Sequence, residues 1–387
     1  MKKIYYVLIA LAVIFIIGFL TCKFLPINPP LKISGFKGDL PLERLELMPG
    51  FEIEVWADKV PDARQLCISP SGTVFVSNRS KGNVFALKDS NGDGQADTRY
   101  TLLTNGNMPN GVAFRDGDLY VAEVNRILKF KNIETRLDNP GEPEVVFDGY
   151  PTDKHHGWKY IAFGPDGKLY VPVGAPCNIC LSDNPIYASM TTINADGTGM
   201  EILHHGIRNT VGFDWHPKTG ELWFTDNGRD WMGDNLPDCE LNRATQPNQH
   251  FGYPFCHHGT LPDPEFGDQR TCEEFVPPVQ KLGPHTAPLG MKFYTGSQFP
   301  AEFKNQIIIA RHGSWNRTRK IGYDVSLVRI DDDSNVVSHE AFIKGWLDES
   351  NDDVWGRPVD MAVMHDGTLL ISDDFADAIY RVYYKGM

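Results

Sequence analysis

One short pattern recurs along this chain and limits its fold more than any other feature. Each copy joins an apolar strand, a polar turn that often contains Asp-Gly, and a second strand of alternating apolar residues. The clear copies occupy residues 66–76, 111–121, 161–171, 211–224 and 361–371, and a degenerate copy pairs 290–294 with 306–310. About six copies at a spacing of roughly 55 residues are typical of the blades of a β-propeller. The pattern therefore predicts an all-β, six-bladed β-propeller over residues 46–387.

Other repeat architectures fit this pattern less well. No stretch has a strong helical period, which disfavours α/β barrels and doubly wound sheets, and parallel β-helices have shorter repeats. In a propeller, the segments that enter the innermost strands open toward the central axis, so residues far apart in sequence meet there. We therefore expect the functional residues just before or after the hairpins. The stretch 234–284 fits no copy of the pattern.

The N-terminus has the pattern of a membrane anchor. Lys2 and Lys3 precede an uncharged, largely apolar run from residue 4 to about residue 22. This run is long for a cleaved secretory signal, and no A-x-A-like site follows it. A helix of this length, at about 1.5 Å per residue, nearly crosses the core of a bilayer, and the two lysines favour a cytoplasmic N-terminus. The sequence predicts a signal anchor over 1–23, a linker over 24–45, and a domain exported to the periplasm or another extracytoplasmic space and held at the inner membrane.

The predicted export also bears on the cysteines, because closely spaced cysteine pairs outside the cytosol form disulfides more often than zinc sites. The two predicted disulfides join Cys177 with Cys180, and Cys256 with Cys272. No second C-x-x-C completes a zinc site, and Leu181 stands where a c-type haem attachment requires His. Cys67 lies in an apolar strand and is expected to be a buried thiol, whereas Cys239 is not assigned.

The net charge excludes one class of partner. The chain has 37 basic and 50 acidic residues and a formal net charge of −13, which repels phosphate backbones, so no nucleic-acid partner is expected. Against this acidic background, histidines and arginines gather beside the hairpins. The segments that contain them are 154–158, 205–209, 226–230, 285–288, 311–317 and 356–358. Their convergence on the axis predicts a cationic pocket that holds a small polyanion through guanidinium donors.

These segments, with further motifs, carry a resemblance to a known family. The matching motifs are Pro49-Gly50-Phe51, Ala63-Arg64, His156 before Gly164-Pro165-Asp166-Gly167, Gly206-Ile207-Arg208-Asn209, His285-Thr286-Ala287-Pro288-Leu289-Gly290 and His312-Gly313-Ser314-Trp315-Asn316-Arg317. Over about residues 40–387 the chain resembles the PQQ-dependent glucose/sorbosone dehydrogenases, most closely the sorbosone dehydrogenase-like branch. The resemblance implies a six-bladed propeller that oxidises an aldose or a sorbosone-like sugar aldehyde by hydride transfer to pyrroloquinoline quinone (PQQ).

The resemblance also implies roles for individual residues. His156 matches the general base that takes the proton from a sugar C1 hydroxyl or a hydrated aldehyde. The matched cofactor-binding positions are Arg208, Asn209 and Arg357. The main-chain carbonyls of Gly228 and Arg229 match the pair that ligates the Ca²⁺ bound to PQQ, and backbone oxygens suit that hard cation.

The chain departs from the soluble glucose dehydrogenases at three cofactor contacts. Their glutamine before the second hairpin falls near Gly106, their lysine after the fifth falls at His312, and their second C-terminal arginine falls near Val359. His312 is expected to replace the lysine as a cofactor-binding residue. Because the chain has no haem attachment motif, its electrons are expected to pass to an external acceptor, either a membrane quinone or a soluble cytochrome.

An acidic loop in the first repeat has the spacing of a calcium loop. Asp89, Asn91, Asp93 and Asp97 place side-chain oxygens at alternate positions, although the closing Glu of an EF-hand is absent. Two interpretations stay open. The loop either binds a structural Ca²⁺ that ties two strands of the first blade, or forms a solvated acidic hairpin turn.

Two functions besides PQQ-dependent oxidation stay open. A Ca²⁺-dependent propeller lactonase would use carboxylate and amide ligands at the bottom of the funnel, and Asp226, Asn227 and Glu240 are the candidates. A non-catalytic binding propeller would present its loops to a partner at the cell surface. The pocket rich in His and Arg favours the PQQ enzyme over both.

Overall fold

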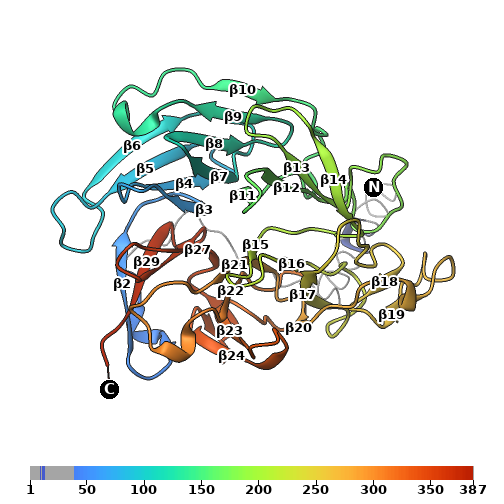
Figure 1. The fold of residues 1–387 in the computed structure, drawn as a ribbon. Coiled ribbons are helices and arrows are strands. Elements are labelled where there is room, and N and C mark those ends of the chain that lie inside the picture. Colours follow the sequence, from blue (N-terminus) through green and yellow to red (C-terminus); the bar gives the residue numbers. More distant parts are fainter. Residues whose placement is uncertain (1–8, 10, 14–38, 387) are drawn as a thin grey trace, which may run out of the picture.

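Six antiparallel sheets surround a central axis in the computed structural model, which describes residues 9, 11–13 and 39–386 (Figure 1). The first blade contains β3 (Ala63–Ile68), β4 (Val74–Asn78), β5 (Val84–Lys88) and β6 (Thr98–Leu103). The second contains β7 (Gly111–Arg115), β8 (Asp118–Ala122), β9 (Ile127–Phe130) and β10 (Glu144–Phe147). The third contains β11 (Ala162–Phe163), β12 (Leu169–Val173), β13 (Ser189–Ile193) and β14 (Glu201–His205). The fourth blade contains β15 (Phe213–Trp215), β16 (Leu222–Asp226), β17 (Asp238–Ala244) and β20 (Gln280–Pro284). The all-β, six-bladed propeller predicted from the repeat is therefore confirmed.

The last two blades include strands from the N-terminal end of the domain. The fifth contains β21 (Pro288–Phe293), β22 (Ile307–Arg311), β23 (Asp324–Ile330), β24 (Val336–Lys344) and β1 (Glu46–Leu47). The sixth contains β27 (Pro358–Val363), β28 (Leu369–Asp373), β29 (Ala378–Tyr384) and β2 (Phe51–Ala57). Because β2 pairs with β29 from Phe51 opposite Tyr384 to Ala57 opposite Ile379, one sheet unites both ends of the domain and closes the ring.

Apolar side chains fill the space between each blade and the next. All five residues of β4 are buried, because an inner strand lies between two neighbouring sheets and is covered on both faces. Six apolar clusters bridge the six pairs of neighbouring blades. Phe75 of the first blade, for example, packs in one cluster with Val121 of the second. The ring is thus held together by hydrophobic contacts all the way around.

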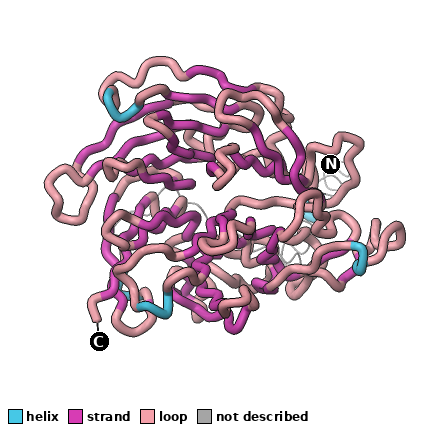
Figure 2. The backbone as a smooth tube through the Cα atoms, in the orientation of Figure 1, coloured by secondary structure: helices cyan, strands magenta, loops and turns pink. Residues whose placement is uncertain are grey.

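Over residues 39–386, helical structure is confined to short turns (Figure 2). The four 3-10 turns are η1 (Leu42–Arg44), η2 (Ile133–Thr135), η3 (Cys272–Glu274) and η4 (Ala301–Phe303). Within the described part of the chain, no helix has the length and apolar character needed to cross a membrane. The predicted anchor over 1–23 lies outside the described residues apart from 9 and 11–13.

The predicted linker over 24–45 is described only from residue 39 onward, and that part belongs to the domain. Leu40 and Leu42 pack against the apolar cluster between the fifth and sixth blades, and β1 follows directly, with Glu46 opposite Lys344 of β24. This end of the segment is therefore anchored by packing and by strand pairing.

The stretch 234–284, which fits no copy of the repeat, includes two regular blade strands. They are β17 and the outer strand β20, whose register places Asp238 opposite Pro284. The excursion between them, over 245–279, contains the hairpin β18 (Cys256–His257) with β19 (Leu261–Pro262), and η3. A second two-strand hairpin, β25 (Leu347–Asp348) with β26 (Asp353–Val354), precedes the last blade. The long insertion is thus shorter than the sequence suggests.

Candidate active site

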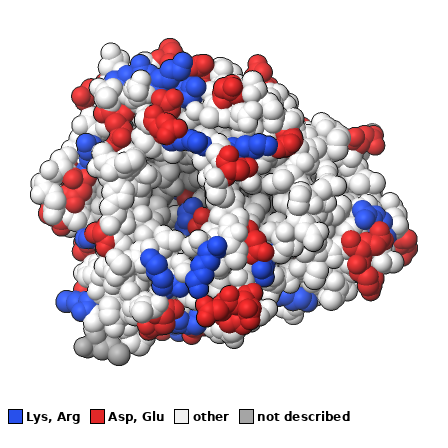
Figure 3. Space-filling model, in the orientation of Figure 1, with Lys and Arg blue, Asp and Glu red and all other residues white. Residues whose placement is uncertain are grey.

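A cavity of about 260 Å³ lies at one end of the ring, where the loops of several blades meet. The residues predicted from the sequence that line it are His156, Arg208, Asn209, Gly228, His312 and Arg357. Other residues that line it include Arg64, Arg79, Trp158, Asp230, Trp315 and Asn316. The molecule is hollowed at the centre of the ring, and charged side chains lie inside the hollow (Figure 3). The predictions for the base, the cofactor contacts and the PQQ-bound Ca²⁺ comprise seven residues. Six of them line this one cavity, and Arg229 does not.

The hairpin register explains this convergence. Ala63 at the start of β3 is opposite Asn78 at the end of β4, and Pro358 at the start of β27 is opposite Asp373 at the end of β28. In an antiparallel hairpin, the residue that enters the innermost strand and the residue that leaves the second strand lie at the same end. In these blades the segments before the innermost strand and after the second strand therefore lie at the same end of the channel, as expected from the sequence.

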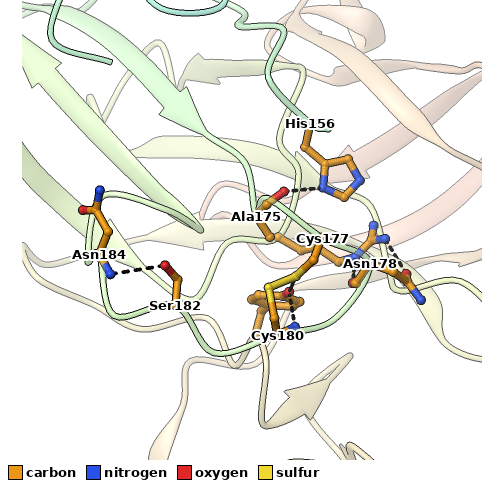
Figure 4. The surroundings of a disulfide bond; sticks show 9 residues. His156, Ala175, Cys177, Asn178, Cys180, Ser182 and Asn184 are labelled. Carbon is orange, nitrogen blue, oxygen red and sulfur yellow. Dashed lines mark hydrogen bonds between the residues drawn. A yellow bond between two sulfur atoms is a disulfide. The ribbon is translucent and has the colours of Figure 1, made fainter. Parts of the chain in front are cut away.

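His156 is held as a base with one free ring nitrogen. Its backbone has a φ of 48°, and its buried ring donates from Nδ1 to the carbonyl oxygen of Ala175 at 2.9 Å (Figure 4). This bond fixes the tautomer, so the lone pair of Nε2 is free to accept a proton. Burial, followed by the charges of Arg208 and His155, holds the pKa of His156 well below its usual 6.5. His156 is thus neutral and ready to accept a proton near neutral pH.

The Arg208 side chain, 4% exposed, is fixed by protein oxygens on several sides. Its Nε donates to the Asn178 carbonyl at 2.9 Å and its Nη2 donates to the Asn178 side-chain oxygen at 2.8 Å. Further bonds join Nη2 to an Asp230 carboxylate oxygen at 3.2 Å, and Nη1 to the Asn227 carbonyl at 3.1 Å. These partners fix the plane of the guanidinium beside His156.

Asn209 and Gly228 lie next to Arg208 on the cavity wall. The backbone N–H of Asn209 donates to Asp226 at 2.6 Å, which orients the residue at the entry of β15. Gly228 lines the cavity, but the Arg229 side chain turns away to Asp263 in the excursion, at 2.5 Å. The structure therefore places Gly228 on the cavity wall and Arg229 outside it, and ligation of Ca²⁺ by their main-chain carbonyls stays a prediction.

On the opposite side of the cavity, His312 is part of a chain of charged hydrogen bonds. Arg357 Nη2 donates to His312 Nδ1 at 2.7 Å, and His312 Nε2 donates to Asp374 at 2.9 Å. Arg64 Nη1 donates to the same carboxylate at 3.0 Å. Burial and the neighbouring Arg357 lower the pKa of His312 to about 3, so it is neutral. Because both of its ring nitrogens have protein partners, His312 orients Arg357, and its role as a cofactor-binding residue stays a prediction.

Arg79 is a cavity cation that sequence reasoning missed. It follows β4 directly, and its guanidinium lies 4.7 Å from the ring centre of Trp158. Among residues 39–386 it forms no ion pair, and burial and the nearby Arg64 lower its pKa to about 10. The signal that could have found it is positional, because the residue after the second strand of other blades also reaches the cavity. Asn227 after β16 and His312 after β22 are two examples.

The candidate lactonase carboxylates are directed into the protein. Asp226 accepts the backbone N–H groups of Arg208 and Asn209, and Glu240 accepts from His258 N–H and from Asn242. Burial raises the pKa of Asp226 to about 6 and that of Glu240 to about 8. Neither lines the cavity, although Asn227 does. Within the described residues, no three His, Cys, Asp or Glu side chains are grouped to hold a metal.

The predicted calcium loop lies away from the cavity, on the β5–β6 turn of the first blade. Asp89 accepts the N–H groups of Gly92 and Gly94, and Asp97 accepts those of Ser90 and Asn91. Asn91 also donates to Asp93 at 3.1 Å. Backbone amides of the loop occupy many of its oxygens, and calcium binding by Asp89, Asn91, Asp93 and Asp97 stays a prediction.

Both predicted disulfides are formed. Cys177 is joined to Cys180, and Cys256 to Cys272. Cys67 and Cys239 are free thiols, but only Cys239 is buried. Cys67 is half-buried because it faces a second cavity, of about 420 Å³, in which Tyr160 and Lys292 also lie. The expectation of a buried Cys67 thiol is therefore wrong.

Two exposed aromatic side chains lie near the mouth of the cavity. Trp231 and Trp315 are 48% and 41% exposed, and their rings meet edge to face with centres 5.5 Å apart. Trp315 also lines the cavity. Exposed indoles at the entrance of a polar pocket offer an apolar surface to a ligand.

Comparison with known proteins agrees with this geometry. Residues 45–385 match the model of a family described as TrAA12-like. A protein of Borreliella burgdorferi, named only as uncharacterized, is 31% identical over 354 residues, which cover 88% of this chain and 91% of that protein.

Several solved structures share the fold at low sequence identity. A calcium structure of the Trichoderma reesei family AA12 enzyme has a TM-score of 0.76 at 18% identity and covers 91% of this chain and 99% of its own. The holo PQQ domain of pyranose dehydrogenase from Coprinopsis cinerea has a TM-score of 0.73 at 18% identity, with 88% and 97% covered. The PQQ-bound aldose sugar dehydrogenase from Streptomyces coelicolor has a TM-score of 0.62 at 18% identity, with 87% and 99% covered.

Proposed function

Because this chain belongs to the TrAA12-like family, we propose that it is an oxidoreductase that oxidises an aldose or a sorbosone-like sugar aldehyde with PQQ. The family match and the shared fold confirm the resemblance to PQQ-dependent sugar dehydrogenases. The observation that carries the proposal is the pairing, in one cavity, of a neutral histidine base with a set of guanidinium groups.

The charge balance of the cavity supports an anionic cofactor. Four arginines line it: Arg64, Arg79, Arg208 and Arg357. Arg64 is paired with Asp374 at 3.0 Å, and Arg208 with Asp230 at 3.2 Å. Arg79 and Arg357 form no ion pair with any carboxylate of the described chain, and the buried Nε of Arg357 has no hydrogen-bond partner there. Both guanidinium groups are half-buried and lack a carboxylate partner among the described residues, so they favour a ligand with carboxylates.

PQQ fits these residues, since it is a flat quinone with three carboxylates. Arg79 and Arg357 would bind carboxylates that their surroundings do not supply, and Arg208 and Asn209 would hold the side next to His156. The main-chain oxygens of Gly228 and Arg229 would contribute to a Ca²⁺ site beside the cofactor. Bound in this cavity, PQQ would supply a two-electron acceptor for the hydride of the sugar.

The residues of the chain perform the proton chemistry. His156 accepts the proton of the substrate hydroxyl at Nε2, while Nδ1–H stays bonded to Ala175 and holds the ring in place. The field of Arg208 disfavours the imidazolium, and an anionic ligand that neutralises Arg208 raises the basicity of His156. The base is therefore strongest when the cavity is filled. Trp315 and Trp231 at the mouth offer apolar faces to the sugar ring.

The electrons leave the protein for an external acceptor, either a quinone or a cytochrome. The proposed signal anchor over 1–23 holds the domain at the outer face of the inner membrane, near either acceptor. The disulfides Cys177–Cys180 and Cys256–Cys272 are consistent with such an oxidising compartment.

Reconstitution tests the proposal. Purified protein is titrated with PQQ in the presence of Ca²⁺, and the absorbance of the bound cofactor is followed together with aldose-dependent dye reduction. We expect saturable binding and dye reduction that requires PQQ. Absence of both would overturn the proposal, and hydrolysis of lactones without PQQ would favour a lactonase.

A further inference from the structure

The segment from Ala175 to Cys180 contacts both residues on which the proposed chemistry depends. Its Ala175 carbonyl accepts the Nδ1–H of His156 at 2.9 Å, and its Ala175 N–H donates to the Arg208 carbonyl at 2.9 Å. Three residues further on, Asn178 bonds the Arg208 side chain (Figure 4). One short loop after β12 therefore fixes the base and its neighbouring cation relative to each other.

Asn178 binds the Arg208 side chain through both its side chain and its backbone. Its carbonyl and its Oδ1 accept from Nε and Nη2 of Arg208, at 2.9 and 2.8 Å. Its Oδ1 also accepts the N–H of Asp230 at 2.8 Å, and its Nδ2 donates to the Asp230 carbonyl at 3.1 Å. Asp230 is in turn the ion-pair partner of Arg208. Asn178 thus orients the arginine directly and also orients its counter-ion.

The disulfide Cys177–Cys180 closes the loop around Asn178. The loop is tied to the excursion of the fourth blade, because the Tyr253 hydroxyl accepts the N–H of Cys180 at 3.0 Å. The cross-link and this bond to Tyr253 restrain the backbone that carries the Asn178 carbonyl. A side chain that is already held in its binding orientation loses less conformational entropy when the ligand binds.

We propose that Asn178 is a positioning residue and that the Cys177–Cys180 disulfide is the constraint that lets it hold Arg208 in the orientation that receives the anionic cofactor. This inference rests on the proposed function for the identity of the ligand. The order of the Arg208 side chain, however, is a property of the empty protein and can be measured without any cofactor.

The disulfide is open to a small reductant. Cys177 and Cys180 are half-buried, and Cys180 lines a separate cavity of about 130 Å³. A dithiol reagent attacks one cysteine sulfur as a thiolate and forms a mixed disulfide, and its second thiolate then displaces that sulfur. The products are two protein thiols and one oxidised, cyclic reagent, so two electrons and two protons are transferred.

Two substitutions separate the positioning role from general stability. Asn178→Ala removes the side-chain bonds to Arg208 and Asp230. Asn184→Ala is the matched control, because Asn184 follows in the same connection between β12 and β13 but its side chain does not bond Arg208 or Asp230. Its Oδ1 accepts the N–H of Ile186 at 3.2 Å, and its backbone N–H donates to the Ser182 hydroxyl at 3.2 Å (Figure 4). The second perturbation is reduction of a Cys256→Ser/Cys272→Ser protein, in which Cys177–Cys180 is the only remaining disulfide of the described chain.

Arg208 order is measured first, in protein without cofactor, by phenylglyoxal modification and peptide mass spectrometry. We expect Arg208 to be protected in the wild type and in Asn184→Ala, and labelled on the order of tenfold faster in Asn178→Ala and after reduction. PQQ affinity is measured next, and we expect it to fall about 10- to 100-fold in the same two cases, as for other groups that orient a primary ligand. Thermal unfolding monitors that the propeller stays folded.

The outcomes distinguish the two proposals. Unchanged Arg208 labelling in Asn178→Ala and after reduction overturns the positioning role, whatever the activity. If the wild type binds no PQQ, the proposed function fails, whereas faster Arg208 labelling still supports the positioning role. If Asn178→Ala or the reduced protein unfolds below the assay temperature, the loop serves the stability of the fold, and the positioning role is rejected.

Discussion

Replacing His156 by asparagine separates the proton acceptor from the group that holds it. The Nδ2 of asparagine sits where Nδ1 of histidine sits, so it can still donate to the Ala175 carbonyl, now bonded at 2.9 Å. Asparagine also tolerates the φ of 48°, which falls in the left-handed region. Only the Nε2 lone pair is lost. The variant is therefore expected to fold and to bind the anionic cofactor as the wild type does.

The expected loss is confined to the turnover number. General-base catalysis contributes about 10²- to 10⁴-fold, which corresponds to about 3–5 kcal/mol in the activation barrier. We expect kcat of His156→Asn to fall by that range, while PQQ affinity stays within about threefold. The assay is steady-state dye reduction with saturating PQQ, after a titration that establishes cofactor occupancy.

A matched control uses the same substitution far from the cavity. His339 lies on β24 at the outer part of the fifth blade, so His339→Asn is expected to keep wild-type turnover. A His156→Asn protein that binds PQQ and retains kcat within about tenfold of the wild type would refute the assignment of the base.

Four further outcomes follow from the described contacts. Burial is the largest cause of the lowered pKa of His156, and it persists when an anionic cofactor offsets the charge of Arg208. We therefore expect kcat/KM to be constant from about pH 6.5 upward and to fall at lower pH as His156 becomes protonated; a midpoint at or above the ordinary value of 6.5 would contradict this. Arg79→Gln removes a cation that has no counter-ion among residues 39–386, so PQQ affinity should fall about tenfold in a binding titration while the melting temperature is kept. Glu240, whose pKa is raised to about 8 mainly by burial, contributes stability that is present below its ordinary 4.5 and is lost as pH rises through 8. The melting temperature of Glu240→Gln relative to the wild type should therefore increase from pH 5 to 9, measured by calorimetry. Asp374→Asn leaves Arg64 buried without its anion, and it should cost about 3–5 kcal/mol in denaturant unfolding.

The repeat was predictable because it depends on local alternation and turn residues. The degenerate fifth copy, for example, forms a true hairpin in which Phe293 of β21 is opposite Ile307 of β22. The mouth of the channel was predictable for the same reason, since hairpin ends mark it in the sequence. The sequence pattern therefore predicts that His156, Arg208 and Arg357 share one cavity, and all three line it.

What the sequence did not reveal depends on contacts between distant segments. Arg79 has no motif around it, and its importance follows from the ring of Trp158 and from the absence of a carboxylate partner among the described residues. The role of His312 is similar, because only the positions of Arg357 and Asp374 show that both ring nitrogens are engaged. Such pairings join different blades, and no local pattern encodes them.

The pairing of β2 with β29 also determines when, during synthesis and folding, the cavity can form. Arg64 follows the start of the ring and Arg357 precedes its last blade, and the two converge on Asp374 and His312 only when Phe51 lies opposite Tyr384. During synthesis, the complete anion-binding cavity forms only after β29 has been made and has paired with β2. We therefore expect a ligand to enter the closed ring from solvent, and we expect a chain truncated before β29 to leave the sixth blade, next to Arg357, incomplete.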